Sequence, residues 1–289
     1  SSARAAQTIE FSATSDCNAL FTGDVAINDN AGAALDAALN ILDTTAPGPT
    51  IAFGGNLTVN GNWNPTVGAR STVNFTGAGR TIQGTTSLLT FDIVNFNGST
   101  TLSALDDNDL TVNELLGIGV AGALTCGDAN DITIATGTWD NDGTFTHGAN
   151  AIQLVTFSGA CTIQGAAQTT FQNVTLTGGT TTMSALDDTD MTVDTTLSIT
   201  GTGSLTCGDA NDITIATGAW DNDGTFTHGT NATQTVSFSG AGAYQGSVNT
   251  TFQNVTFTAG TTTMSAVDGT DLTVDETLTI TGTGTLTCG

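Results

Sequence analysis

The chain has 289 residues, a formal net charge of −24, and three basic residues, Arg4, Arg70 and Arg80, against 27 acids. It contains no lysine, which excludes Schiff-base catalysis, a P-loop and lysine-based isopeptide crosslinks. The acidic balance argues against nucleic acid and anionic membranes as partners, because phosphate groups are bound mainly by Lys and Arg, and no apolar run is long enough to span a bilayer.

Residues 1–50 do not repeat. We expect strands over Thr8 to Phe11 and Phe21 to Ile27, followed by a short helix over residues 31–42 (AGAALDAALNIL), where apolar residues recur at helical spacing. Such a helix would cover the first coil of the fold that follows. We therefore assign residues 1–50 to capping and assembly, and residues 51–289 to a repeat domain.

The rest of the chain has an 81-residue period, which is the spacing between Cys126 and Cys207. Residues 124–146 read LTCGDANDITIATGTWDNDGTFT, and residues 205–227 read the same except for one Thr-to-Ala difference. A fixed period of this kind indicates a stacked repeat architecture. A catalytic centre is usually unique within a chain, whereas the distinctive residues here come in twos and threes. We therefore do not expect an enzyme.

Each period divides into four pieces of about 20 residues, with short strands that alternate apolar and polar residues and end at Gly, Asn or Asp. This pattern predicts an all-β fold, a parallel β-helix (β-solenoid) of about 12 coils with about 4.8 Å between coils. The competing prediction is a tandem array of β-sandwich domains, which would need hairpin connections and linkers between the repeats. No linker separates the repeats.

Acidic residues cluster in the predicted turns, at positions that recur with the repeat. Asp-x-Asp-Gly segments offer the oxygen ligands that Ca²⁺ prefers, but none of them has the full twelve-residue loop with its terminal Glu. The alternative is that Asp and Asn are simply good turn residues. No cofactor is required by the sequence, and Ca²⁺ stands as a candidate structural ion. The candidate ligands are Asp106, Asp107, Asp109, Asp140, Asp142, Asp187, Asp188, Asp190, Asp221, Asp223, Asp268 and Asp271.

The remaining distinctive residues are interpreted as structural. Cys126, Cys161 and Cys207 alternate with apolar neighbours and are predicted to be small buried side chains. His147 and His228 share one Phe-Thr-His-Gly context, and no Ser/His/Asp or Cys/His constellation singles either out.

The sequence stops at Gly289, a point that is mid-repeat in the two earlier copies. An open solenoid end is a template for strand addition, and we expect the N-terminal segment of a second copy to cover it, head to tail. No arginine follows Arg80, and residues 81–289 carry 21 acids and no base, so this contact would join a less acidic end to an acidic one. The candidate assembly residues are Arg70, Arg80, Cys17 and Cys288; the two cysteines either pair between subunits or are free.

The motifs W-D-N-D-G-T-F-T-H-G, V-x-F-S-G, I/Y-Q-G and T-T-F-Q-N-V-T occur in residues 139–175 and again in 220–256. In these motifs the chain resembles repeat-rich surface and adhesin-like β-solenoid proteins of microbes. The resemblance covers about residues 55–289, with a degenerate first copy at Trp63 to Phe96. It implies a right-handed parallel β-helix at the cell surface, and no particular ligand.

Proteins of that kind are usually longer and anchored, so this short chain favours a subunit that polymerises. We expect a secreted structural protein that forms a pilus-like extracellular filament with itself as partner. One alternative is a surface adhesin or carbohydrate-binding module, with glycans as partners. A second alternative is an ice-binding protein, in which the Thr runs at 180–182 and 261–263 order water.

Overall fold

The computed structural model describes residues 8–11, 18–27, 38–41, 48–65, 70–86, 88–103, 108–185, 189–231, 233–265 and 271–289. All the regular secondary structure within these ranges is β-strand. No helix that could span a membrane occurs in them. The chain divides into two compact units, Ser1–Thr133 with Asp142–Ala149, and Ile134–Asn141 with Asn150–Gly289.

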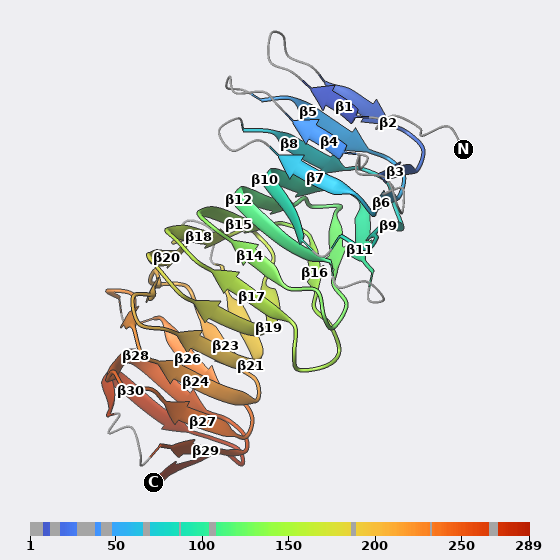
Figure 1. Ribbon diagram of the computed structural model, residues 1–289. Coiled ribbons are helices and arrows are strands. Elements are labelled where there is room, and N and C mark those ends of the chain that lie inside the picture. The colour runs from blue at the N-terminus through green and yellow to red at the C-terminus, as the bar shows by residue number, and fades with distance from the viewer. Residues whose placement is uncertain are drawn as a thin grey trace. The chain divides into compact units, whose positions relative to one another are not determined.

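Both units are parallel β-solenoids, as the sequence predicted (Figure 1). The first contains β1 (Thr8–Phe11), β2 (Ala19–Phe21), β3 (Val25–Ile27), β4 (Ala38–Ile41), β5 (Thr50–Phe53), β6 (Leu57–Val59), β7 (Asn62–Pro65), β8 (Thr72–Phe75), β9 (Arg80–Gln83), β10 (Leu88–Phe96), β11 (Ser99–Leu102), β12 (Asp109–Ile118), β13 (Ala123–Thr125) and β16 (Thr144–Thr146), and β14 (Ile132–Ile134) lies at its boundary.

The second unit contains the remaining strands. These are β15 (Gly137–Asn141), β17 (Leu154–Phe157), β18 (Cys161–Gln164), β19 (Thr169–Leu176), β20 (Thr180–Met183), β21 (Met191–Ile199), β22 (Ser204–Thr206), β23 (Ile213–Ile215), β24 (Gly218–Asn222), β25 (Thr225–Thr227), β26 (Thr235–Phe238), β27 (Gly242–Gln245), β28 (Thr250–Phe257), β29 (Thr261–Met264), β30 (Leu272–Ile280) and β31 (Thr285–Cys288).

The length of one turn follows from the register of the strands. Asp190 and Asp212 start strands in successive turns and are 22 positions apart, and Asp212 and Thr235 are 23 positions apart. Other turns are shorter, such as the one that sets Thr235 in register with Asn254. The structure has about ten turns, where about twelve were predicted. The difference arises because the observed turn is longer than a division of each repeat into four coils implies.

Each turn has three straight stretches, and a long strand supplies two of them. The second half of β21, then β22, then β23 complete one turn before β24 returns to pair with β21. Counted in this way from β19 to β28, one 81-residue repeat contains eleven stretches, or three and two-thirds turns. The prediction of four coils per repeat is therefore wrong.

A consequence is that equivalent residues of successive repeats lie on different faces. Asn173 belongs to the column that continues through Thr196 and Ala219. Its equivalent Asn254 belongs to the column of Thr235 and Thr277. Identical sequence is thus rotated by one third of a turn from one repeat to the next.

The core is built from the inward-facing residues of the strands, since inward and outward residues alternate along each strand. In the first unit, Phe21, Phe53, Phe75 and Phe96 form a column of stacked rings whose centroids are 5.4, 5.5 and 5.4 Å apart. Stacked aromatic pairs add about 0.5–1.5 kcal/mol each beyond the area that they bury. The outward residues between them are mostly Thr, Ser and Asn, which confirms the predicted alternation of a buried and a solvated face.

The N-terminal segment is part of the solenoid. Strand β1 coincides with the predicted strand, β3 is the C-terminal part of the strand predicted over Phe21 to Ile27, and β2 begins before it and shares only Phe21 with it. The three pair in parallel with β4, β5 and β6 as a first turn. The predicted capping helix is wrong at its C-terminal end, where β4 pairs with β1 on one side and β7 on the other. The rest of that prediction, residues 31–37, falls outside the described part of the chain. Pairing on both edges overrides the intrinsic helix propensity of Ala and Leu.

Candidate functional site

Asp and Asn side chains at the starts of strands connect each turn to the next. In the second unit, Asp190 Oδ1 accepts the backbone N–H of Asp212 at 2.9 Å, and Asp212 Oδ1 accepts that of Thr235 at 2.7 Å. Asn249 Oδ1 accepts the N–H of Asp271 at 3.0 Å. In each pair the acceptor belongs to the earlier turn and the donor to the later one.

The first unit follows the same rule. Asp24 Oδ1 accepts the N–H of Asn56 at 2.8 Å, and Asn56 Oδ1 accepts that of Thr81 at 2.9 Å. Asp109 Oδ1 accepts the N–H of Asp131 at 2.9 Å. We call a hydrogen bond in which an Asp or Asn side chain accepts a backbone N–H of the next turn a turn cap. Turn caps give the stack a chemical direction, with side-chain acceptors aimed toward the C-terminal end.

Asp92 has the opposite direction. Asp92 lies at the bend of β10 and is buried, and its Oδ2 accepts hydrogen bonds from the backbone N–H and the hydroxyl of Ser71, one turn earlier. It lies at a mid-strand corner, not at a strand start, so the rule for strand starts still holds.

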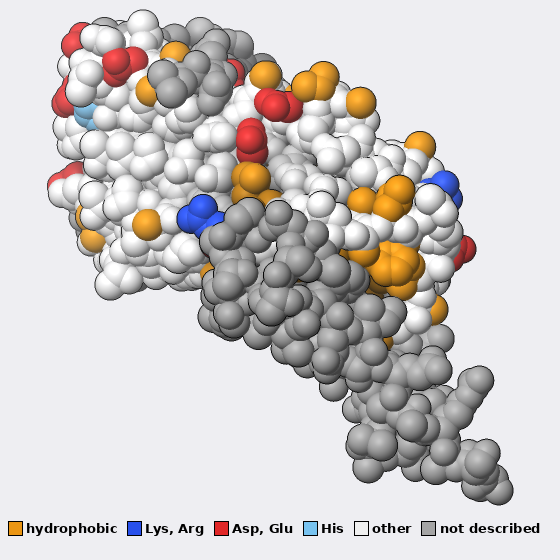
Figure 2. Space-filling view, turned by 90° about the horizontal axis from the view of Figure 1, so that it is seen from above, with side chains coloured by type: hydrophobic (Ala, Val, Ile, Leu, Met, Phe, Trp, Pro, Cys, Tyr) orange, Lys and Arg blue, Asp and Glu red, His pale blue; other side chains and the backbone are white. Residues whose placement is uncertain are grey.

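The structure places several predicted Ca²⁺ ligands in these caps. Asp109 and Asp190 are turn caps, and Asp223 accepts the N–H and the hydroxyl of Ser247, each at 2.7 Å. In the part of the chain that the structure describes, no three His, Cys, Asp or Glu side chains gather as a metal site. Figure 2 shows the acids as separate points on a largely uncharged surface. Asp140, Asp142 and Asp221 have partners within the chain, Asp271 begins the last turn, and Asp106, Asp107, Asp187, Asp188 and Asp268 are not among the described residues.

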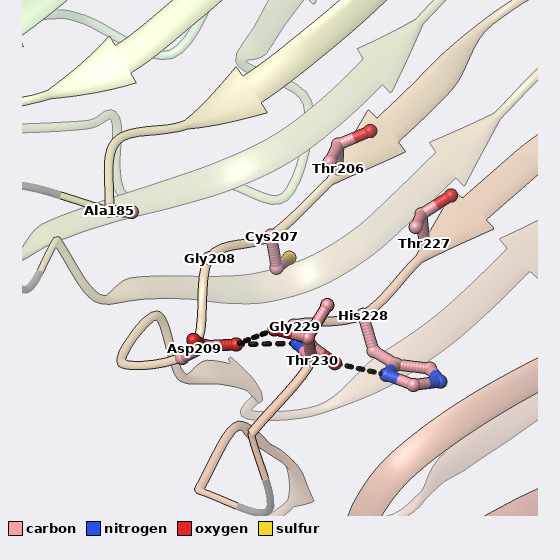
Figure 3. Close-up of a pocket in the computed structure, with 9 residues that line it drawn as sticks. All are labelled: Ala185, Thr206, Cys207, Gly208, Asp209, Thr227, His228, Gly229 and Thr230. Carbon is pink, nitrogen blue, oxygen red and sulfur yellow. Dashed lines mark hydrogen bonds between the residues drawn. The ribbon is translucent and has the colours of Figure 1, made fainter.

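A pocket of about 290 Å³ opens in the second unit, lined by Ala185, Thr206 to Asp209 and Thr227 to Thr230 (Figure 3). Asp209 accepts hydrogen bonds from the backbone N–H groups of Asn231 and Thr230 and from the Thr230 hydroxyl. The Asn231 N–H makes the largest contribution to holding the pKa of Asp209 below its ordinary value. Asp209 therefore acts as a turn cap at the rim of the pocket.

The other polar groups of this pocket do not form a nucleophilic centre. His228 Nδ1 lies 2.6 Å from the carbonyl oxygen of Gly229, and its Nε2 lies 3.1 Å from Asp275 Oδ2. Cys207 is buried, and its burial raises the pKa of the thiol far above the ordinary value, which disfavours the nucleophilic thiolate. His228 connects the end of β25 to β30.

The cysteines divide by exposure. Cys126, Cys161 and Cys207 are buried, which confirms the prediction, and burial raises the pKa of each thiol. Cys288 is an exposed free thiol with its Sγ 4.0 Å from Met264 Sδ. The other assembly cysteine, Cys17, belongs to a segment that the structure does not describe.

The two predicted assembly arginines lie in the first unit. Arg70 is exposed, and its Nε lies 3.1 Å from Glu114 Oε2. Arg80 begins β9 and is in register with Thr100 of the following turn.

The last turn has an uncovered apolar face. Leu278 and Ile280 of β30 are 47 % and 50 % exposed, whereas the equivalent Leu197 and Ile199 of the preceding repeat are 0 % and 1 % exposed. The sequences around the two pairs are nearly the same, so the difference comes from the next turn, which covers β21 and not β30. Sequence analysis predicted an open end here but did not name these two residues, because their local sequence is nearly the same as that of Leu197 and Ile199.

The first turn has an uncovered edge as well. Leu20 of β2 is 67 % exposed, and Phe21 stacks on Phe53 on one side only among the described rings. Each of β2 and β3 pairs with one described strand, β5 and β6 respectively. The structure thus has two candidate interaction surfaces: the first-turn face, which includes Leu20, and the last-turn face, which includes Leu278 and Ile280.

Threonine ladders run along the solvated side of the second unit. Thr138, Thr162, Thr182, Thr206 and Thr227 follow one another in register over five turns. The predicted Thr runs contribute their outer members only, because the middle residues Thr181 and Thr262 are buried.

No protein-family model, curated protein or solved structure matches this chain. The features that bear on its function are therefore the two uncovered faces, the turn caps and the charge.

Proposed function

We propose that this protein is the structural subunit of an extracellular, pilus-like filament in which copies stack head to tail through their solenoid ends. The observation that carries the proposal is the way successive turns cover one another: Leu197 and Ile199 are fully covered by the turn that follows them, and Leu278 and Ile280, about half exposed in residues 1–289, present the same kind of surface. Inside the molecule, this surface is covered by another turn of the same fold. A second copy can supply such a turn.

Covering the exposed apolar side chains contributes part of the free energy of such a contact. Fully burying a Leu or Ile side chain contributes about 1.5–3 kcal/mol, so covering two half-exposed ones contributes about 2 kcal/mol. Backbone pairing along β30 and β31 adds to this, because both strands have an open edge among the described residues. A heterologous contact of this kind continues from copy to copy and builds a fibre.

The distribution of charge supports a head-to-tail order. Arg70 and Arg80 belong to the N-terminal part, and every residue from 81 onward that carries a formal charge is an acid. Joining two C-terminal ends would bring two strongly acidic surfaces together. Joining unlike ends reduces this repulsion, which is screened further by salt.

Cys17 and Cys288 are proposed to form a disulfide between subunits, since Cys288 is an exposed thiol on the last turn. A non-reducing gel tests this directly. A ladder of covalent oligomers that collapses with reductant supports the disulfide, and monomer alone from purified, oxidised fibres excludes it.

Electron microscopy with sedimentation tests the filament. We expect unbranched fibres of the wild-type protein, and loss of fibres in Leu278→Asp, which places a charge on the last-turn face. Val120→Asp is the matched control, because Val120 is 84 % exposed in a turn between β12 and β13, and both of these strands have a paired strand on each side. Discrete particles for the wild-type protein at all concentrations would contradict the proposal.

An ice-binding role is the second candidate, favoured by the five-membered threonine ladder that includes Thr182 and Thr206. Thermal hysteresis measured on the wild-type protein and on Thr182→Val tests it. A carbohydrate-binding role has less support, because the exposed large apolar residues among those described are all aliphatic. Sugar rings would need an exposed aromatic platform there.

A further inference from the structure

We infer that His228 Nε2 and Asp275 Oδ2 bind a divalent transition-metal ion such as Zn²⁺, and that the bound ion links two turns of the second unit. The inference goes beyond the proposed filament and does not depend on it. It concerns a histidine and an acid that are not among the predicted Ca²⁺ ligands, and both lie inside the described part of the chain.

The ring of His228 is held by one of its two nitrogens. Nδ1 lies 2.6 Å from the carbonyl oxygen of Gly229, and a carbonyl oxygen can only accept, so Nδ1 carries the proton and the neutral ring offers its lone pair at Nε2. His147 has the same contact with Gly148, also at 2.6 Å. Histidines that bind metals usually donate their other ring N–H to a carbonyl or carboxylate oxygen in this way.

The outer nitrogen of this ring faces a carboxylate. Figure 3 shows the ring turned away from Asp209, the acid that lines the pocket. Nε2 lies 3.1 Å from Asp275 Oδ2, so the lone pairs of a neutral imidazole and of an ionised carboxylate meet there. They repel each other unless a cation, either a proton or a metal ion, lies between them.

The separation of the two atoms suits a metal ion. Bonds from Zn²⁺ to a His nitrogen and to a carboxylate oxygen are about 2.0–2.2 Å long, so two of them that meet at about 100° span about 3.2 Å. The observed separation is 3.1 Å. Imidazole is a ligand that Zn²⁺ and its neighbours in the transition series prefer, whereas Mg²⁺ and Ca²⁺ prefer oxygen alone.

Water completes the coordination. The side chains of His228 and Asp275 are 22 % and 51 % exposed, so solvent reaches the point between them. Among the described residues, no third His, Cys, Asp or Glu joins the pair in a metal-binding group. Structural zinc sites have four protein ligands, so this site is expected to bind more weakly than those do. The acidic chain raises the local concentration of divalent cations and partly offsets that loss.

The pair connects turns that are not neighbours. His228 follows β25, and the next strand, β26, begins at Thr235. Thr235 is in register with Asn254 of β28, and Asn254 with Thr277 of β30. Asp275 comes shortly before Thr277 in the same strand, so the contact passes over the turn of β28 to the second turn on. A bound ion therefore ties three successive turns together at one corner.

The first unit has a cation at a comparable link. Arg70 Nε lies 3.1 Å from Glu114 Oε2. Arg70 precedes β8, and Glu114 lies at the bend of β12, two turns on, because β8 pairs with β10 and β10 with β12. The second unit contains no Arg or Lys that could pair with Asp275 in this way. A metal ion held by His228 supplies the positive charge that the guanidinium supplies to Glu114.

Calorimetric titration with Zn²⁺ tests the site in protein that carries His147→Gln, which leaves His228 as the one imidazole of the chain. An excess of Mg²⁺ in the buffer occupies the acidic surface without competing for imidazole. We expect saturable binding of Zn²⁺, an affinity lower by about tenfold or more after Asp275→Asn, and no measurable binding after His228→Gln.

Asp271→Asn in the same background is the matched control. It removes the same charge from the same strand, about 13 Å from Asp275 at about 3.3 Å per residue, and is expected to change the affinity by less than about twofold. Thermal melts of every variant without Zn²⁺ show whether the fold is retained.

A second readout needs no variant. The ring NMR signals of His228 in the wild-type protein are expected to shift or broaden on addition of Zn²⁺, and to stay in place when Mg²⁺ is added at the same concentration. Unmoved ring signals, or no saturable binding of Zn²⁺ in the presence of Mg²⁺, would overturn the site and leave a proton between the two groups. Equal losses in D275N and D271N would show a general effect of charge and would overturn the assignment of Asp275.

Discussion

At the level of single residues, the acids of this protein are mainly structural where the structure describes them. An Asp at the start of a strand accepts the backbone N–H one turn on, as Asp190 does for Asp212. The sequence showed the clusters but left Ca²⁺ binding and turn formation as alternatives. Only the register, which sets a residue against a partner one full turn away, shows what the described carboxylates contact.

The turn caps predict a dependence of stability on pH. The pKa values of Asp209 and Asp223 lie below their ordinary value of 3.8, chiefly because Asn231 N–H and the Ser247 hydroxyl, respectively, donate to them. A lowered pKa in the folded state stabilises the fold above the unfolded pKa, and this contribution is lost as pH falls through the folded value. We expect the melting temperature of the wild type to fall more between pH 5 and pH 3 than that of D209N/D223N.

Glu276→Gln is the control for this prediction, because it removes an exposed carboxylate that caps no described N–H. Protonation of the many other acids changes the melting temperature in all variants, so the difference from the wild type is the quantity measured. If the double variant and E276Q follow the wild type equally through this range, the caps do not carry the pH dependence.

At the level of elements, alternation and turn residues predicted the strands and the parallel solenoid correctly. The 81-residue period misled the count of turns, because eleven stretches do not divide evenly by three. The helix over residues 31–42 was predicted from local spacing, but β4 pairs with β1 and β7, which are distant from it in the sequence. An open last turn was predicted from the point at which the sequence stops, but Leu278 was not singled out, since Leu197 has nearly the same neighbours in sequence.

The pair Leu197 and Leu278 gives a matched prediction at this level. Leu197→Ala removes a fully buried side chain and is expected to lower the free energy of unfolding by about 2–5 kcal/mol. Leu278→Ala removes a half-exposed one and is expected to cost about 1 kcal/mol or less in the isolated subunit. Denaturant unfolding at concentrations too low for assembly measures both, and equal losses would contradict the assigned burial.

A glycine at a corner gives a second prediction. Gly246 has φ +123°, and an added Cβ would lie 2.2 Å from the carbonyl oxygen of Asn222, so the backbone of two turns would have to separate. We expect Gly246→Ala to destabilise the fold by more than about 1 kcal/mol, the usual cost of positive φ alone. Gly23→Ala is the control, because an added Cβ there meets nothing within 4 Å. Similar melting temperatures of the two variants would show that the corner is looser than described.

At the level of the whole molecule, the protein combines a net charge of −24, which opposes association, with two uncovered apolar faces, which favour it. Residues 81–289 carry 21 acids and no base, and repulsion between them opposes both folding and assembly. Counterions reduce that repulsion. The charge therefore sets the conditions in which copies can stack, while the end faces determine how they stack.

Divalent cations are accordingly expected to raise the melting temperature and lower the critical concentration, with Ca²⁺ and Mg²⁺ acting alike and high NaCl reproducing much of the effect. Thermal melts with chelator, with each cation and with NaCl measure this. No change on addition of chelator to protein in millimolar Ca²⁺ would contradict the counterion effect, and a large preference for Ca²⁺ would indicate a specific site.

Head-to-tail stacking is tested most directly by cryo-electron microscopy of the wild-type protein at high concentration. We expect unbranched filaments in which β30 and β31 of one copy are followed by the first-turn strands of the next at one strand spacing of about 4.8 Å, without a break in the stack. Discrete particles, or filaments joined through their sides with the last turn left uncovered, would contradict it.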